Sequence, residues 1–164
     1  MKGTKGIVAF AFGAPCTIES NKRIARIASH KAHEFGAPVY TQCDIFIEHG
    51  IEVYNCEEIE SLPPPTLRIA RGAVQWAQER RLSELWIVAA QPHLWRCLRD
   101  LERAVRETEA QIKILACEEI WYYPPDGWFC LNSTQERTRY REAWDKRERI
   151  LKFMPFFIYK RIGS

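Results

Sequence analysis

A short apolar run that leads directly into an amphipathic segment constrains the fold of this sequence most. Residues 85–90, Leu-Trp-Ile-Val-Ala-Ala, contain no charge, which is typical of a strand covered on both faces. Leu94, Leu98, Leu101 and Val105 follow at spacings of four, three and four residues, which predicts a helix with one apolar face. A buried strand joined to such a helix is the repeating unit of α/β folds, so we expect a parallel sheet.

The same unit begins the chain. Residues 7–12 form another apolar run, which the turn Gly13-Ala14-Pro15 ends. Ser20 is expected to cap the following helix, and Gly36 is expected to end it in the left-handed conformation.

Three further strands complete the predicted sheet, at residues 38–43, 51–56 and 112–116. Only seven residues separate the first two, so either the second is an edge strand or the crossover between them is abbreviated. Thr66 is expected to cap the helix that leads into residues 85–90. We therefore predict a three-layer Rossmann-like α/β fold, with a mainly parallel sheet of about five strands and a C-terminal helix.

The 164 residues are enough for one substantial core and too few for two ordinary domains. We expect a single domain over residues 1–164, with its core at about 7–118 and an aromatic loop and basic C-terminal segment at 119–164. No signal-peptide pattern and no apolar run of membrane-spanning length is present, so a cytoplasmic location is expected. The six cysteines include no Cys-x-x-Cys pair, and His30 and His33 lack a third ligand, so no metal site is predicted.

The predicted ligand site lies where residues 85–90 meet the next helix. Small molecules bind open α/β sheets outside the carboxyl ends of the strands, where helix N-termini present free N–H groups. Arg96 would hold an anion there, and His93 would act as general acid or base. Asp44 or Glu118 is the candidate carboxylate to orient His93 or hold a metal. The other residues expected at this rim are Gly13, Ala14, Thr17, Thr66, Arg68 and Gln91.

Over residues 7–118 the chain resembles the SanA/YdcF/ElyC-like family of uncharacterised α/β domains. The matching residues are Gly13, Asn21 with Arg23, Thr66, and His93 with Arg96. The chain departs from the family pattern at Thr41-Gln42-Cys43-Asp44, where Ser-Gly-Gly is usual. The resemblance implies a Rossmann-like fold, adds Asn21 to the ligand-binding residues, and suggests S-adenosylmethionine as a ligand and a link to envelope metabolism.

These observations favour a protein that binds a small anionic ligand, with hydrolase or transferase activity as an extension. The candidate ligands are a nucleotide, S-adenosylmethionine or another phosphorylated compound. The glycine turn lacks Gly-x-Gly-x-x-Gly, which disfavours a nicotinamide dinucleotide.

The charge distribution supports an alternative function. Residues 137–164 hold nine basic and three acidic residues, whereas residues 1–136 hold 15 and 18. Residues 137–162 are therefore a candidate for contact with a membrane surface, RNA or a protein partner, in a module without catalysis. The other interpretation is a solvated helix whose apolar tail covers the sheet or a homodimer interface. Its inner face is expected to hold Tyr140, Ala143, Trp144, Arg147, Ile150, Leu151 and Met154. The aromatic loop at 118–129 would be a lid or a seal for the core.

Overall fold

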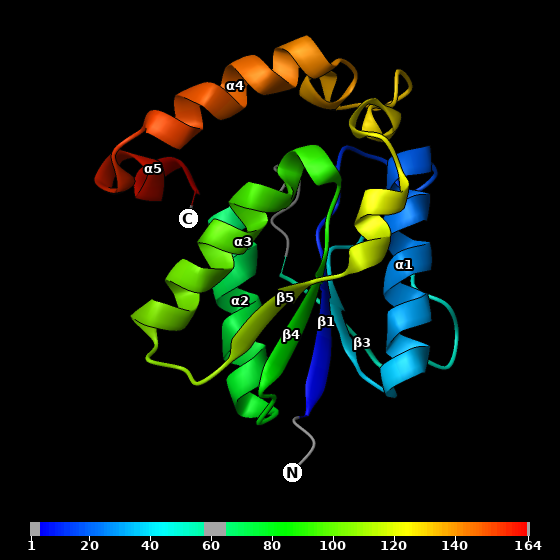
Figure 1. Cartoon of the computed structure of the whole chain (residues 1–164), viewed down its shortest axis with the longest axis vertical. Helices are drawn as coiled ribbons and strands as arrows, with labels where there is room; N and C mark the ends of the chain where they lie inside the picture. Colours follow the sequence, from blue (N-terminus) through cyan, green and yellow to red (C-terminus); the bar gives the residue numbers. More distant parts are fainter. Residues whose placement is uncertain (1–3, 58–64, 164) are drawn as a thin grey trace.

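The structure is a computed structural model that describes residues 4–57 and 65–163 (Figure 1). Its elements are β1 (Lys5–Ala9), α1 (Glu19–Phe35), β2 (Val39–Thr41), β3 (Val53–Asn55), α2 (Thr66–Glu79), β4 (Glu84–Val88), α3 (Gln91–Glu107), β5 (Lys113–Ala116), the 3-10 helices η1 (Glu118–Tyr122), η2 (Pro125–Trp128) and η3 (Glu136–Thr138), α4 (Arg141–Phe153) and α5 (Phe156–Gly163). The predicted α/β class, with five strands and a C-terminal helix, is confirmed.

The five strands form one parallel sheet in the order β3-β2-β1-β4-β5. The chain moves outward from β1 through β2 to β3, and α2 then carries it back to the other side of β1. At the centre of the sheet, Val8 of β1 lies between Tyr40 of β2 and Ile87 of β4. The strand order reverses between β1 and β4, and the carboxyl ends of these two strands are the place where such folds bind ligands.

Helices cover both faces of the sheet (Figure 1). Helix α1 covers one face, while α2 and α3 pack against each other on the other face. The strands are apolar because both of their faces are buried: Ile7, Leu85 and Ile87 are fully inaccessible. The crossover between β2 and β3 is abbreviated and contains no helix, and β3 lies at the edge of the sheet.

Two predicted helix caps are wrong, because the side chains bond elsewhere. The N-cap of α1 is Ile18, and the Ser20 hydroxyl instead donates to the carbonyl of Phe12 at 2.9 Å. The N-cap of α2 is Pro65, so Thr66 is the first residue of the helix and its hydroxyl is available for other contacts. The predicted stop at Gly36 is confirmed, with φ of 61°.

Helices α4 and α5 cross the carboxyl end of the sheet, above α2 and α3 (Figure 1). Trp144 and Leu151 of α4 are buried, as predicted for the inner face of the helix, and Tyr159 of α5 is buried as well. Tyr140, Ala143 and Ile150, predicted on the same face, are exposed, because only a narrow stripe of α4 packs on the sheet domain. Leu151 and Tyr159 form a small second core with Leu67 at the start of α2. The C-terminal segment is therefore packed onto the sheet domain and covers the carboxyl edge of the sheet.

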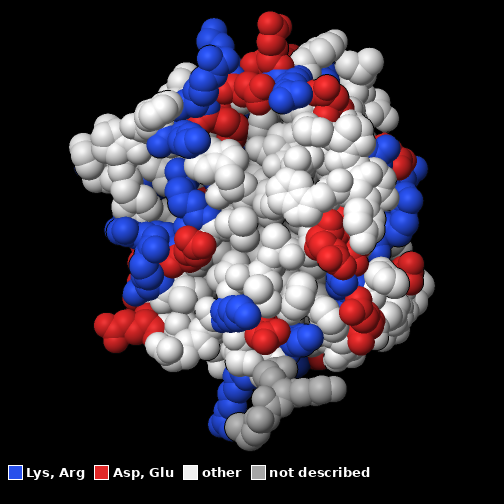
Figure 2. Space-filling view, viewed as in Figure 1, with Lys and Arg blue, Asp and Glu red and all other residues white. Residues whose placement is uncertain are grey.

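The aromatic loop closes one end of the core. Trp128 and Ile120 are fully buried, whereas Trp121 and Tyr122 are exposed. The sealing interpretation therefore holds for Trp128. Charged side chains of both signs are spread over the surface around an uncharged central area in Figure 2. Within the described ranges, no helix is long and apolar enough to cross a membrane.

Candidate anion-binding site

The site predicted at the start of α3 lies in the crevice between the carboxyl ends of β1 and β4. Aromatic side chains fill this crevice. The Trp144 ring, which α4 supplies, contacts Phe12 at a centroid distance of 4.7 Å and His93 at 5.3 Å. The Trp144 indole N–H donates to the carbonyl of Pro92 at 3.1 Å, which fixes α4 to the first turn of α3. The predicted rim is thus covered by α4.

His93 is buried beneath this cover, with 6% of its surface exposed. Its Nε2 lies 3.2 Å from the hydroxyl oxygen of Thr66 at the start of α2. Its Nδ1 has no hydrogen-bond partner in the part of the chain that the structure describes. The structure therefore brings together two of the predicted residues, and it leaves one ring nitrogen of His93 available to a further group.

The surroundings of His93 favour the neutral ring. Burial lowers the pKa of His93 well below its usual value, and the positive charges of Arg96, Arg147 and Arg137 lower it further. Neither Asp44 nor Glu118 is among the charges that set this pKa. A neutral imidazole offers one donor and one acceptor, and the burial and positive charges that lower the pKa of His93 oppose its gain of a proton unless a bound anion offsets them.

Arg96 is the second predicted residue that the site contains. Its side chain is buried, and its guanidinium group lies over the Trp144 ring with a centroid distance of 5.3 Å. One terminal nitrogen lies 3.2 Å from a carboxylate oxygen of Glu148 in α4. The Arg96 Nε–H has no partner among the described residues, so this donor is buried without compensation.

Two arginines that follow the sheet core complete a group that we call the arginine cluster: Arg96, Arg137 and Arg147. Arg147 shares the carboxylate oxygen of Glu148 with Arg96, at 3.5 Å, and the Arg147 Nη1 is buried without a hydrogen bond to any described residue. The pKa of Arg147 is lowered to about 10, mainly by burial and also by the positive charges of Arg96 and Arg137. Burial also lowers the pKa of Arg137, and the charge of Arg96 adds to this.

The arginine cluster carries an excess of positive charge. Glu148 is the only carboxylate that forms an ion pair with any of its three members in residues 4–57 and 65–163. Burial raises the pKa of Glu148, while the charges of Arg96 and Arg147 hold it down. Even with Glu148 ionised, three guanidinium groups face one carboxylate, so the cluster has a net charge of about two in a partly desolvated place.

The predicted residues of the first loop have a different role. Gly13 has φ of 88°, and a side chain there would clash with Ser133 and Thr138. The backbone N–H of Ala14 donates to the Ser133 hydroxyl at 3.3 Å, and its carbonyl accepts from the Thr134 N–H at 2.8 Å. Residues 133–138 therefore occupy the face of the turn where a ligand was expected.

Asn21 also serves this turn. Its amide oxygen accepts from the Phe12 N–H at 3.0 Å, and its amide nitrogen donates to the carbonyls of Gly13 and Pro15 at 3.0 and 3.1 Å. The side chain is fully buried and all its hydrogen-bonding groups are used. Asn21 therefore stabilises the first turn through its side-chain hydrogen bonds.

The remaining predicted residues lie apart from His93, except for Gln91. The Gln91 side chain, at the start of α3, has a buried amide oxygen without a partner among the described residues. Asp44 follows β2, which β1 separates from β4, and Glu118 is exposed after β5. Arg68 lies in a groove beside β3 with Tyr54 and Trp76.

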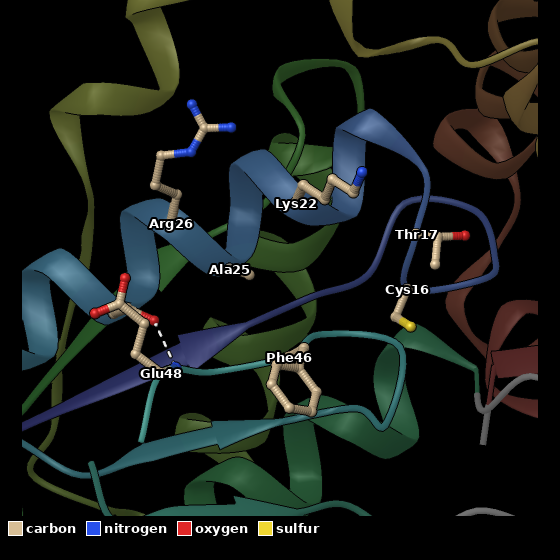
Figure 3. A pocket seen from close by; sticks show the side chains of 8 residues that line it. Cys16, Thr17, Lys22, Ala25, Arg26, Phe46 and Glu48 are labelled. Carbon is tan, nitrogen blue, oxygen red and sulfur yellow. Dashed lines mark hydrogen bonds between the residues drawn. The ribbon is translucent and has the colours of Figure 1, made fainter. Parts of the chain in front are cut away.

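Thr17 is exposed and borders a groove of about 400 Å³ on the outer side of α1 (Figure 3). Lys22 and Arg26 project from α1 on one side of this groove, and Phe46 and Glu48 lie on the other. The backbone N–H of Glu48 donates to Ser29 at 3.1 Å, which ties the two sides together. This groove is separate from the site at His93.

One group of possible metal ligands lies on α1, where His30, Glu34 and Glu119 have ligand atoms within 4.8 Å of one another. The ammonium group of Lys31 lies 2.9 Å from Glu34 and 2.8 Å from Glu119. Burial lowers the pKa of Lys31, but its hydrogen bonds to both carboxylates raise it by more. A protein cation already occupies both carboxylates, so we assign this group a structural role.

Sequence reasoning missed Arg137, Arg147 and Glu148 as parts of the site and treated their segment as a solvated or partner-binding helix. The available signal was the position of Arg147 on the apolar face, three residues after Trp144 and four before Leu151. A charged residue on a buried helix face is expected to have a partner or a function. No family model matches this chain, and no curated protein matches it.

Proposed function

We propose that this protein binds a small molecule through a phosphate group, held at the carboxyl edge of the sheet by the arginine cluster. The observation that carries the proposal is the positive charge that Glu148 compensates only in part, on the buried Arg96 and the half-buried Arg137 and Arg147. Arg96 Nε, Arg147 Nη1 and His93 Nδ1 are also buried nitrogens without a partner among the described residues. An anion with several oxygen acceptors would satisfy both the charge and the open donors.

The local backbone adds to this preference. Helix α3 begins at Gln91, and its dipole favours a negative charge at the same edge, although Pro92 has no N–H and the His93 N–H already donates to the Ala90 carbonyl. Arginine binds phosphate through two parallel N–H donors, which suits a cluster of guanidinium groups better than a cluster of lysines. The proposed ligand therefore contacts α3, α4 and residue Arg137 together.

The net charge of each candidate ligand distinguishes between the compounds that the sequence analysis left open. A phosphate group carries close to two negative charges at neutral pH, which matches the excess of the cluster. A nucleotide or a sugar phosphate fits this requirement. S-adenosylmethionine fits it less well, because its sulfonium and amino groups are positive and only its carboxylate is negative. We therefore favour a phosphorylated compound.

A catalytic extension of this function rests on the contact between Thr66 and His93. A neutral imidazole within hydrogen-bond distance of a hydroxyl can accept its proton, which is the arrangement that activates hydroxyl nucleophiles. A hydrolase or transferase acting on the bound phosphate compound is the second candidate function. Its residues would be Thr66 and His93 for proton transfer, with Arg96 and Arg147 stabilising negative charge.

Thermal unfolding with and without phosphate compounds tests the binding function. Inorganic phosphate, AMP, ATP, glucose 6-phosphate and S-adenosylmethionine are added separately to the wild type and to Arg147→Gln. A ligand at 100 times its Kd stabilises the folded state by about 2.7 kcal/mol, which is a measurable rise in Tm. We expect this rise with a phosphate compound in the wild type and its loss in Arg147→Gln.

Arg68→Gln is the matched control, since Arg68 is an arginine of the same domain that lies in the separate groove beside β3. This variant should keep the full response to the ligand. A response that persists in Arg147→Gln, or that is lost equally in Arg68→Gln, would exclude the arginine cluster as the site. The family resemblance and the cytoplasmic location stay predictions.

A further inference from the structure

The outer side of α4 and α5 exposes a group of large apolar side chains. Half of the exposed large hydrophobic residues in the described structure lie between residues 150 and 162. They are Ile150, Phe153, Phe157, Ile158 and Ile162, and we call them, with the neighbouring basic residues Arg149, Lys152, Lys160 and Arg161, the α4–α5 surface. Phe153 is 82% exposed, the largest value in the group. Exposure of this kind costs free energy in water and marks an interaction surface.

The inner side of the same helices holds them in place. Tyr159 is buried and its hydroxyl donates a hydrogen bond to the carboxylate of the buried Asp100 in α3. Arg99 lies over the Tyr159 ring at 4.2 Å, and Arg103 lies over the Phe156 ring at 3.9 Å. These contacts fix α5 on α3. The exposed apolar residues are therefore presented by an anchored helix pair.

The charges on this surface have one sign. Residues 149–163 contain Arg149, Lys152, Lys160 and Arg161 and no acidic residue. All four basic residues are exposed. At the left edge of Figure 2, where Figure 1 places α5, uncharged atoms project from the molecule beside Lys and Arg side chains. Apolar and basic groups therefore share one exposed region.

We propose that the α4–α5 surface docks on an anionic membrane surface. Helices that lie at such an interface bury aromatic and aliphatic side chains at the boundary of the acyl chains, while Lys and Arg contact lipid phosphates. Phe153, Phe157 and Ile162 would supply the buried part. Arg149, Lys152 and Arg161 would supply the electrostatic part, which requires anionic lipid.

Two other occupants fit the surface less well. In a symmetric dimer the same patch faces itself, so the positive charges of Arg149, Lys152 and Arg161 would meet the same charges of the second copy. RNA would satisfy the positive charge, and Phe could stack on bases. The aliphatic residues Ile150, Ile158 and Ile162 offer no such stacking, whereas lipid acyl chains accept all five apolar residues.

This inference is independent of the proposed phosphate site. Trp144 and Glu148 belong to the buried side of α4, whereas Ile150 and Phe153 are exposed. Variants of the exposed residues therefore leave the arginine cluster intact, and the two proposals can fail separately.

Sedimentation with lipid vesicles tests the docking surface. The whole chain is mixed with vesicles of phosphatidylcholine containing 30% phosphatidylglycerol, and separately with vesicles of phosphatidylcholine alone. We expect binding only to the anionic vesicles. The double variant Phe153→Ser/Phe157→Ser should reduce the partition coefficient by more than about tenfold, since it removes two apolar rings from the interface. Lys152→Gln should reduce it about fivefold, the effect of about 1 kcal/mol per basic residue.

Phe46→Ser is the control, because Phe46 is 71% exposed but lies in the groove beside α1. This variant should bind vesicles as the wild type does. Unchanged Tm values would show that the variants are folded, as expected for exposed positions. Absence of wild-type binding to anionic vesicles would overturn the proposal. So would a dimer in analytical ultracentrifugation that Phe153→Ser/Phe157→Ser dissociates, or binding of an RNA oligonucleotide that these substitutions abolish while vesicle binding persists.

Discussion

The two halves of the carboxyl edge use their buried polar groups in opposite ways. After β1, the side chain of Asn21 and the backbone of Gly13 and Ala14 bond to one another and to residues 133–138. After β4, the side chains of His93 and Arg96 are equally buried but retain nitrogens without partners among the described residues. Both halves occupy positions where open α/β sheets bind ligands.

A position at the carboxyl edge of the sheet is therefore not sufficient to make a polar residue a ligand-binding residue. The sequence placed Gly13, His93 and Arg96 at this edge, and the family resemblance added Asn21. Only the count of satisfied hydrogen bonds distinguishes them, because a polar group whose bonds are all used has nothing to offer a ligand. The half after β1 is structural by this criterion, and the half after β4 is the candidate site.

The largest expected effect comes from Glu148→Gln, which tests the arginine cluster after β4. This change removes the carboxylate that Arg96 and Arg147 share. Loss of one partner from a buried ion pair costs up to about 3–5 kcal/mol, because the remaining charges are left uncompensated, and relief of the burial that raises the pKa of Glu148 offsets part of this cost. Urea denaturation should show this loss, and added inorganic phosphate should restore part of it. A loss below about 1 kcal/mol would mean that the guanidinium groups are solvated.

Asn21→Ala tests the β1 side. The change leaves the Phe12 N–H and two carbonyls without their partner, and each buried unsatisfied group costs about 1–3 kcal/mol. We expect the free energy of unfolding to fall by about 3 kcal/mol. The Tm increase caused by a phosphate ligand should remain. If that increase disappears while the variant is folded, Asn21 belongs to the ligand site and the comparison fails.

The smallest effect concerns the pH dependence of stability through His93. The pKa of His93 in the folded protein lies below its usual value of 6.5, so the unfolded chain binds the proton more readily. Stability from His93 is therefore present above pH 6.5 and is lost as the pH falls below it, by up to about 1.4 kcal/mol per pH unit.

Glu148 acts in the opposite sense, because burial raises its pKa above 4.5 and its contribution is lost as the pH rises through the raised value. The difference between the wild type and His93→Gln isolates the histidine. Between pH 7 and 5.5 the wild type should lose about 1 kcal/mol more than the variant in urea denaturation. Parallel pH profiles would show that the His93 ring is accessible to protons in the folded protein.

Much of the fold follows from local sequence patterns. The apolar runs at residues 7–12 and 85–90 predict buried strands, and β1 and β4 overlap them at Lys5–Ala9 and Glu84–Val88. The residues that cap the helices could not be predicted from the local sequence in the same way. Ser20 and Thr66 are suitable caps by residue type, but their hydroxyls have tertiary partners, the Phe12 carbonyl and His93. Contacts between distant residues thus override a local preference.

Contacts between distant residues also limited the prediction of the candidate site. His93 and Arg96 were predictable, because they follow a buried strand and begin a helix. Arg137, Arg147 and Glu148 reach the site only because α4 folds back across the sheet edge. Nothing within the segment itself specifies which surface it will cover. The apolar face with Trp144 indicates that α4 is packed, but the identity of its neighbours depends on the shape of the whole sheet.

The position of α4 has a consequence for the way in which the nascent chain folds. All five strands of the sheet lie within residues 5–116, so they emerge from the ribosome before Trp144 and Glu148 do. Domains fold during synthesis as their segments emerge. Until α4 emerges, His93 and Arg96 lie at an uncovered edge, and Arg96 is without its ion-pair partner Glu148. The edge that α4 covers in the folded protein is thus open to solvent in the nascent chain.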